Sequence, residues 1–346
     1  MNKKSIIVIF IIALIITISA FGILTLNKLF IKPLVSIPNA NTQVFYFPTN
    51  SDFDDVRNIL VESGIITNIK AFDLMSKIKS YKQSVKSGKY IIKNNMTANE
   101  LVSFLRSGAQ TPSKVTFNNI RFLPNFVGKV SPKFEFDSTQ LITLLSNKEF
   151  INKIGYNKQN IISLFLPNTY NIWWNSSPED FVYRMKKEHD RFWNKERMSK
   201  ASKMNLTPIE VNILASIVQE ETNNKAEMSR IAGVYYNRLK IGMLLQADPT
   251  ARFAYGDFSV RRVNYDYLKI DSPYNTYKYK GLPPGPICMA NPITIDKVLN
   301  YENHKYYYFC AKPDNSGKHV FARNLRQHNN NANAYHRYLN KQRIYR

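Results

Sequence analysis

The chain has 346 residues, enough for two domains of ordinary size, and its 44% hydrophobic content is that of a folded protein, which excludes global disorder. Lys and Arg number 48 against 25 Asp and Glu, and the formal net charge of +23 attracts polyanions: nucleic acid, anionic lipid or an anionic cell-wall glycan. Cys288 and Cys310 are too few for a disulfide scaffold; they either pair in an oxidising compartment or are two buried thiols. No metal-ligand spacing surrounds them or the five histidines, so we expect no metal and no other cofactor.

An uncharged, mostly apolar run follows the basic start of the chain. It extends from Ile6 to Leu26, and 21 helical residues span roughly 30 Å, the thickness of a bilayer core. Lys3 and Lys4 precede it, so the positive-inside rule places the N-terminus in the cytoplasm. A cleaved signal peptide is the alternative, but the run is long for one and no Ala-x-Ala site follows. We expect a single-pass anchor in the plasma (inner) membrane over 1–28, a linker over 29–41 and an exported remainder, which argues against a nucleic-acid partner.

Residues 42–115 have the pattern of a small α+β module, because period-2 and helical hydrophobic patterns alternate along them. The predicted elements are a strand over 42–47, a helix capped by Ser51 with Asp54, a helix over 71–78, a strand over 88–93 and a helix capped by Thr97 with Glu100.

The next region, 116–204, is less regular and is predicted to be mostly helical. The predicted elements are a strand over 114–122, helices within 139–153, and one long helix that begins at Ser177-Pro178-Glu179 and extends toward Ser202. The aromatic segment 164–174 ("LFLPNTYNIWW") either belongs to the core or stacks on sugar rings.

Residues 207–221 carry the most informative pattern in the chain. Thr207-Pro208-Ile209-Glu210 is typical of a helix start, with a capping threonine and a proline at the first helical position. Leu214 and Val218 define an apolar stripe, and at about 100° per residue Glu221 points within roughly 20° of Leu214. Glu220 falls off the stripe, where it can reach water. The helix therefore directs one of two adjacent acids toward apolar surroundings.

Burial of an ionised carboxylate is costly, so the pKa of Glu221 should be raised unless a cation pairs with it. A glutamic acid that keeps its proton near neutral pH suits a general acid for glycosidic cleavage. The alternative is that the helix ends near Thr222, and that Glu221 frays into solvent or bonds Arg230 or Arg238.

The segments that follow have the composition of a polar groove. A second helix is predicted over 226–240, and 242–257 is predicted to be a loop rich in turn formers. The segment 272–287 combines Asn, Thr and Tyr side chains with Pro-Gly turns, which suit a groove that hydrogen-bonds a polyol.

Four segments resemble, in order and spacing, the YceG-like endolytic murein transglycosylases. They are "LASIVQEETNN" (214–224), "AGVYYNRLKIGMLLQADPT" (232–250), "SPYNTYKYKGLPPGPI" (272–287) and "HVFARNLRQHN" (319–329). The likeness is dense over about 205–330 and weaker back to about 42, where "SGKYIIKNNMTANELVSFLRSG" looks like the family's LysM-like module. The resemblance implies an α+β fold with an N-terminal transmembrane helix, a LysM-like module over 42–115, an intermediate region over 116–204 and a catalytic domain over 205–346.

The resemblance also implies an activity. It is that of a lytic transglycosylase, a lyase that cleaves the MurNAc–GlcNAc β-1,4 bond of nascent peptidoglycan without water and leaves 1,6-anhydro-MurNAc ends during cell-wall assembly. Glu221 stands at the family's catalytic position, directly before threonine, and the mechanism needs one carboxyl and no metal. The resemblance implies substrate contacts for Gln246, Asp248, Thr250, Tyr274, Asn275, Thr276, Gly281, Pro284, Gly285, Asn324 and His328, with loop architecture as the alternative for each. Expected partners are glycan strands, the membrane and cell-wall synthases.

Two departures from the family accompany this likeness. Gln219 stands where the family commonly has glutamate, and 117–122 ("FNNIRF") replaces a Glu-Gly segment. A catalytically silent peptidoglycan-binding scaffold that recruits synthases is the main alternative, and the intact Glu221 counts against it. An exported nucleic-acid-binding protein is a third, which the absence of Gly-rich phosphate loops disfavours.

Overall fold

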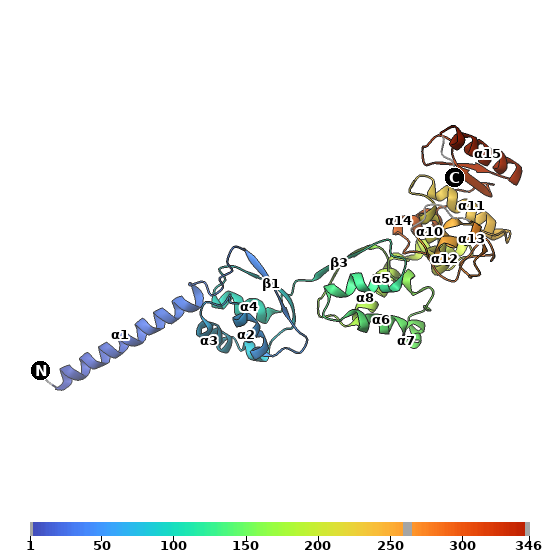
Figure 1. The fold of residues 1–346 in the computed structure, drawn as a ribbon. Helices are drawn as coiled ribbons and strands as arrows, with labels where there is room; N and C mark the ends of the chain where they lie inside the picture. Colours follow the sequence, from blue (N-terminus) through green and yellow to red (C-terminus); the bar gives the residue numbers. More distant parts are fainter. Residues whose placement is uncertain (1–2, 259–264, 343–346) are drawn as a thin grey trace. The chain divides into compact units, whose positions relative to one another are not determined.

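The computed structural model describes residues 3–258 and 265–342, and the chain divides into two compact units (Figure 1). Unit 1 comprises Met1–Lys114 with two later segments, Lys133–Phe136 and Asn171–Ser177, and unit 2 comprises the rest. The elements of unit 1 are α1 (Lys3–Phe30), β1 (Thr42–Phe47), α2 (Phe53–Glu62), α3 (Ile69–Ile78), β2 (Gly88–Lys93) and α4 (Ala98–Ser107). The fold is mixed α+β, as the sequence predicts.

The first helix, α1, is long and apolar. Its portion Ser5–Phe30 is long and apolar enough to cross a membrane, and its large side chains are exposed. Only near its C-terminal end does it join the core of unit 1, through the buried Leu29. The helix therefore has the length and composition predicted for an anchor.

The two-stranded sheet of unit 1 carries its core. β1 and β2 pair antiparallel, with Thr42 opposite Lys93 and Phe47 opposite Gly88. Alternate residues of both strands, among them Phe47 and Tyr90, are buried with the apolar faces of α2, α3 and α4. The later segments join this unit through contacts such as the backbone N–H of Thr49, which donates to Glu135 at 2.7 Å.

Helix capping in this unit agrees with the sequence at one helix and differs at another. Thr97 and Glu100 form the predicted capping box of α4. At α2 the predicted cap, Ser51 with Asp54, is wrong by one residue: Asp52 caps the helix, and Asp55 bonds back to it. The shift starts the helix at the buried Phe53, and an aspartate carboxylate caps as well as a serine hydroxyl does.

Unit 2 is mostly helical. Its elements are α5 (Leu123–Val130), α6 (Ser138–Ser146), α7 (Lys148–Lys153), α8 (Pro178–Phe192), α9 (Lys195–Lys203), α10 (Pro208–Glu221), α11 (Met228–Lys240), α12 (Asp248–Tyr255), α13 (Tyr265–Lys269), α14 (Pro292–Leu299), β5 (Tyr308–Ala311), β6 (His319–Ala322) and α15 (Leu325–Lys341). The short strands β3 (Ser113–Phe117) and β4 (Asn168–Ile172) pair with each other in a two-stranded sheet.

Three predictions for unit 2 are wrong in detail. The long helix expected from Ser177 is two helices, because the Asn194 side chain accepts from the backbone N–H of Arg197 and starts α9. The expected loop 242–257 contains α12, which begins at Asp248-Pro249 with proline in its first turn. The strand expected over 114–122 ends at Phe117, and α5 was not predicted.

The aromatic segment 164–174 belongs mainly to the core. Phe165, Leu166, Tyr170 and Ile172 are buried, whereas Trp173 is 51% exposed. Of the two roles considered for this segment, the core accounts for all of these residues except Trp173.

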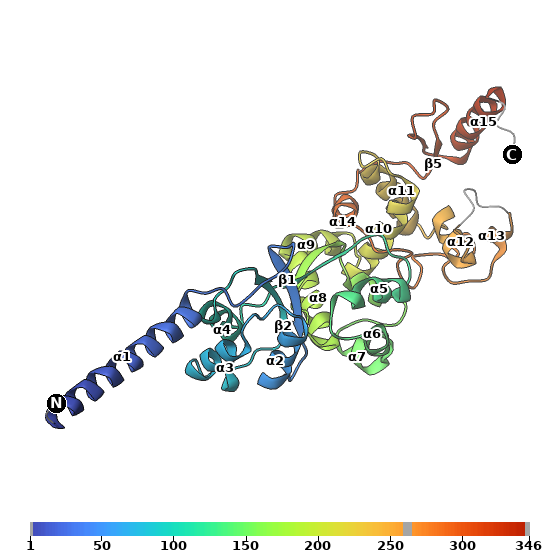
Figure 2. The same cartoon turned by 60° about the vertical axis from the view of Figure 1, so that its left-hand side comes forward.

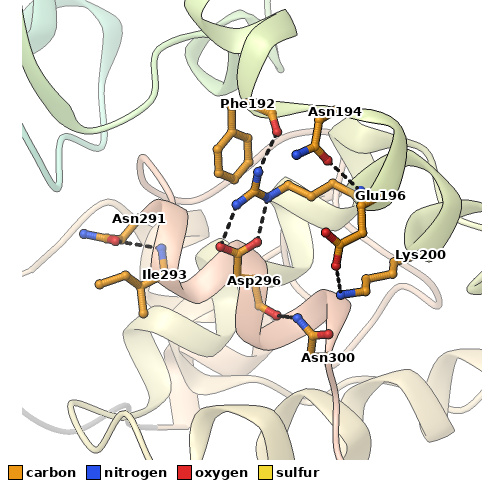
Figure 3. Close-up of polar contacts among 9 residues, drawn as sticks. Phe192, Asn194, Glu196, Lys200, Asn291, Ile293, Asp296 and Asn300 are labelled. Carbon is orange, nitrogen blue, oxygen red and sulfur yellow. Dashed lines mark hydrogen bonds and ion pairs between the residues drawn. The ribbon is translucent and has the colours of Figure 1, made fainter.

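The core of unit 2 surrounds α10. Every residue from Val211 to Val218 is buried, so the apolar surface is wider than the predicted stripe. Helices α11, α12 and α14 pack around α10, and an ion pair fastens α14 to α9: Arg197 donates to Asp296 at 2.7 and 3.0 Å, and to the carbonyl oxygen of Phe192 (Figure 3). α10 is thus a rigid support for the residue at its C-terminal end.

A small sheet and a helix complete unit 2. β5 and β6 pair antiparallel, with Tyr308 opposite Ala322, and α15 lies beside them (Figure 2). β5 also contacts α11, the helix that follows α10.

Candidate active site

A cavity of about 410 Å³ lies at the C-terminal end of α10. It is lined by residues of α10, α11, the start of α12, the 277 loop, the β5–β6 pair and α15. The polar and aromatic lining residues are Glu221, Tyr235, Arg238, Gln246, Asp248, Tyr277, Tyr308, Phe309, Cys310, His319 and His328. Segments far apart in the sequence therefore meet around a single carboxyl at the helix end.

Glu221 is the last residue of α10 and is partly buried, with its carboxyl facing this cavity. The hydroxyl of Tyr235, on α11, donates a hydrogen bond to Oε1. Oε2 makes no hydrogen bond to any residue in the described part of the chain. The helix ends where the alternative interpretation placed it, with Thr222 as its C-cap, but Glu221 does not fray because it is still helical. Neither arginine bonds it: Arg230 pairs with Glu302 at 2.9 Å, and Arg238 donates to the carbonyl oxygens of Tyr307 and Leu245.

The surroundings hold the proton on Glu221 near neutral pH. Burial raises its pKa to about 7, against the opposing effect of the bond from Tyr235, which favours the ionised form. The charge of Asp248 adds to the increase, and that of Arg238 opposes it. The sequence-based expectation of a raised pKa is confirmed, and its main cause is the desolvation that the apolar stripe indicates.

Asp248 stands across the cavity at the start of α12 and accepts a hydrogen bond from the hydroxyl of Tyr277. The two loops that carry this pair are tied together behind it. The backbone N–H of Ala247 donates to Oγ1 of Thr276 at 3.0 Å, and the hydroxyls of Thr250 and Thr276 lie 2.7 Å apart. These buried bonds fix Asp248 and Tyr277 relative to each other.

The predicted site residues separate into two groups. Glu221, Gln246, Asp248 and His328 line the cavity together. None of the other eight lines the cavity. Four of them are buried: Thr250, Asn275, Thr276 and Gly285. The other four are partly or fully exposed: Tyr274, Gly281, Pro284 and Asn324.

Several of the second group support the loops. The amide of Asn275 donates to the carbonyl oxygens of Leu268 and Ile270 at 3.0 and 2.9 Å. At Gly285 a Cβ atom would lie 2.0 Å from the carbonyl oxygen of Gln159, so only glycine allows this approach. Asn324 caps α15, which carries His328. The structure thus gives these residues architectural contacts.

Five side chains that line the cavity were not among the predicted site residues: Tyr235, Arg238, Tyr277, Tyr308 and His319. Arg238 was considered only as a partner of Glu221. Tyr235 lies within the predicted helix 226–240, where its ring is buried and its hydroxyl reaches Glu221. His319 belongs to the fourth family-like segment, and its imidazole Nδ1 lies 3.2 Å from Glu227. The sequence offered one signal for Tyr235: it is a tyrosine in the helix that directly follows the one carrying the predicted buried acid, and a buried carboxyl needs a hydrogen-bond donor.

A second cavity, of about 450 Å³, lies beside the preceding residues of α10. Glu220 lines this second cavity, forms an ion pair there with Arg121, and has a side chain that is 14% exposed. Gln219 accepts from the backbone N–H of Asn291 at 2.7 Å. The divergent segment 117–122, which provides Arg121, therefore packs against the last turn of α10.

Cys288 is buried and Cys310 partly buried, and both are unpaired thiols. No group of three His, Cys, Asp or Glu within 3–258 and 265–342 is arranged to hold a metal ion.

The model of the YceG-like family matches residues 45–334. The chain belongs to the YceG-like family. It is 30% identical over 306 residues to the endolytic murein transglycosylase of Bacillus subtilis, with 83% of each chain covered. It is 26% identical to the endolytic murein transglycosylase of Streptococcus pneumoniae. The matched region covers 82% of this chain and 57% of that relative. The fold is similar to the crystal structure of a YceG-like protein from Listeria monocytogenes, with a TM-score of 0.55 and 26% sequence identity. The match covers 84% of this chain and 98% of that one.

Proposed function

We propose that this YceG-like protein is an endolytic murein transglycosylase that cleaves nascent peptidoglycan strands non-hydrolytically, with Glu221 as its acid and base. Two relatives bear that enzyme's name and cover more than four-fifths of this chain. One observation carries the assignment of the residue: a carboxyl with a pKa raised to about 7 faces a 410 Å³ cavity, and one of its oxygens makes no hydrogen bond to a described residue.

The reaction follows from that geometry. The protonated Glu221 gives its proton to the oxygen of the MurNAc–GlcNAc bond as the bond to C1 of MurNAc breaks. Tyr235 then stabilises the carboxylate through the bond to Oε1. The carboxylate takes the proton from the C6 hydroxyl of the same MurNAc. The C6 oxygen then bonds to C1 and gives the 1,6-anhydro ring. The sugar supplies the nucleophile, so one carboxyl is enough.

The groove residues divide between contact and support. Gln246, Asp248 and His328 line the cavity and are proposed to contact the sugar. The other predicted contacts, Thr250, Tyr274, Asn275, Thr276, Gly281, Pro284, Gly285 and Asn324, are proposed to act by shaping the loops around it.

The remaining assignments concern the whole chain. We propose that α1 anchors it in the plasma (inner) membrane with the N-terminus in the cytoplasm and the catalytic domain, 205–346, outside. The module 42–115 is proposed to be LysM-like and to lie next to the membrane after the linker 29–41, with 116–204 as an intermediate region. Cell-wall synthases are proposed as partners, since cleavage of nascent strands requires access to them.

Cleavage in water enriched in ¹⁸O tests the reaction type. The full-length protein in detergent should release muropeptides with anhydro ends that contain no ¹⁸O, because the C6 hydroxyl replaces water. Reducing ends labelled with ¹⁸O would mean hydrolysis and would contradict the proposal.

A further inference from the structure

The catalytic cavity contains a buried cation without an acidic partner. Arg238, on α11, is 7% exposed, and no carboxylate in the described part of the chain lies within 4 Å of its guanidinium. Its Nε donates to the carbonyl oxygen of Tyr307 at 2.6 Å, and Nη1 donates to that of Leu245 at 2.7 Å. Nη2 makes no hydrogen bond to a described residue. Carbonyl dipoles thus fix the group, and no carboxylate among the described residues forms an ion pair with it.

A second unsatisfied nitrogen lies close by. The guanidinium of Arg238 lies over the ring of Tyr308 at 5.2 Å, and the imidazole of His328 stacks on the same ring at 5.3 Å. Nδ1 of His328 is buried and has no hydrogen-bond partner among residues 3–258 and 265–342. Both side chains line the cavity that holds Glu221.

Such an arrangement is costly unless a ligand completes it. Arginine does not lose its proton in proteins, so burial cannot neutralise Arg238 as it neutralises Glu221. Buried charges and buried polar atoms are normally paired, and an unpaired one costs free energy that a bound anion recovers. A guanidinium held by two of its nitrogens and free at a third is oriented in advance for a carboxylate.

We propose that Arg238 and His328 form a carboxylate-binding subsite of the catalytic cavity, which binds a carboxylate of the glycan strand and so places the scissile bond at Glu221. This subsite rests on the proposed function, because it names the part of that substrate that the cavity recognises. Peptidoglycan offers two sources of a carboxylate: the lactyl group of MurNAc when no peptide is attached, and the stem peptide when one is. The shared chemistry is the carboxylate, and the source is left to the experiment.

The test measures binding to full-length Glu221→Gln in detergent, so that the strands are not cut. Two kinds of soluble strand are compared, one with stem peptides and one from which an amidase has removed them, each before and after amidation of its carboxylates. The variants His328→Gln and Arg238→Lys are made in this background. Both keep the net charge at neutral pH, since burial lowers the pKa of His328, so general attraction to the chain is unchanged. His336→Gln, an exposed position on the same helix, is the matched control.

Amidation should weaken binding of one kind of strand by tenfold or more, the range of a charge-assisted hydrogen bond. The strand that loses affinity identifies the source of the carboxylate. This amidation penalty should largely disappear in His328→Gln and in Arg238→Lys, and should persist in His336→Gln.

An amidation penalty equal in all four proteins would overturn the subsite, since it would then reflect the net charge alone. Variants that weaken native and amidated strands equally would also overturn it, because the two side chains would then only support the fold. Failure of the proposed function is seen separately: the protein with Glu221 intact would release no anhydro ends from either strand, whatever the binding results.

Discussion

The hydrogen bond from Tyr235 opposes the rise that burial causes in the pKa of Glu221, and Tyr235→Phe removes this bond without emptying the space that the ring fills. The bond lowers the pKa of Glu221, so its loss should raise that pKa above about 7. Activity requires the protonated acid, and the fall in rate at alkaline pH should therefore move to higher pH. At the same time the carboxylate formed in the reaction loses a donor.

The size of the shift follows from the two forms of the carboxyl. A hydrogen bond to a charged group contributes about 1.5–3 kcal/mol and one to a neutral group about 0.5–1.5, a difference of roughly 1–1.5 kcal/mol. At 1.36 kcal/mol per pKa unit, the alkaline limb should move up by about one pH unit. The rate on the plateau below it should fall by about tenfold, because the product carboxylate is less stable.

The assay is the pH dependence of anhydro-muropeptide release between pH 5 and 9. Tyr236→Phe is the control, because the neighbouring hydroxyl donates to the carbonyl oxygen of Met204 at 3.2 Å, and the ring does not line the cavity. An alkaline limb of Tyr235→Phe that stays in place or moves to lower pH would refute the assignment of Glu221 as the titrating acid.

Three further predictions concern charge, stability and packing. Asp248→Asn should shift the same limb to lower pH, because the charge of Asp248 raises the pKa of Glu221. The pKa of Glu221 rises from 4.5 to about 7 on folding, so the free energy of unfolding falls as pH increases through that window. Glu221→Gln should therefore stabilise the fold by up to about 3 kcal/mol at pH 8 and not at pH 4, and urea unfolding at the two pH values measures the difference. Gly285→Ala should lower the free energy of unfolding by about 1–3 kcal/mol through its clash with Gln159, whereas Gly128→Ala, with open space around it, should be neutral or stabilising.

The sequence predicted the local structure well where one short-range interaction decides it. The capping box of Thr207 with Glu210 and the apolar positions that follow determine α10, and the structure contains both. The same kind of local reasoning placed the α2 cap one residue early, because Ser51 and Asp52 are both competent caps and packing of Phe53 decides between them.

The site was only partly accessible from the sequence. Helix geometry predicts that Glu221 points toward apolar surroundings. Burial there raises its pKa, so the direction of the pKa shift could be predicted as well. The partners that tune it come from other elements, however: Tyr235 from α11 and Asp248 from α12, a helix that turn-forming residues concealed. The pairing of Arg121 with Glu220 joins residues 99 positions apart, and nothing in local periodicity predicts it.

The most direct test of the central role of Glu221 is the mass spectrum of the glycan ends released by Glu221→Gln and by Glu220→Gln from the same peptidoglycan. The two positions are adjacent on α10 but line different cavities. Loss of anhydro ends in Glu221→Gln alone, with glycan binding retained, is the predicted result. Anhydro ends produced by Glu221→Gln at the unsubstituted rate, or lost only in Glu220→Gln, would contradict it.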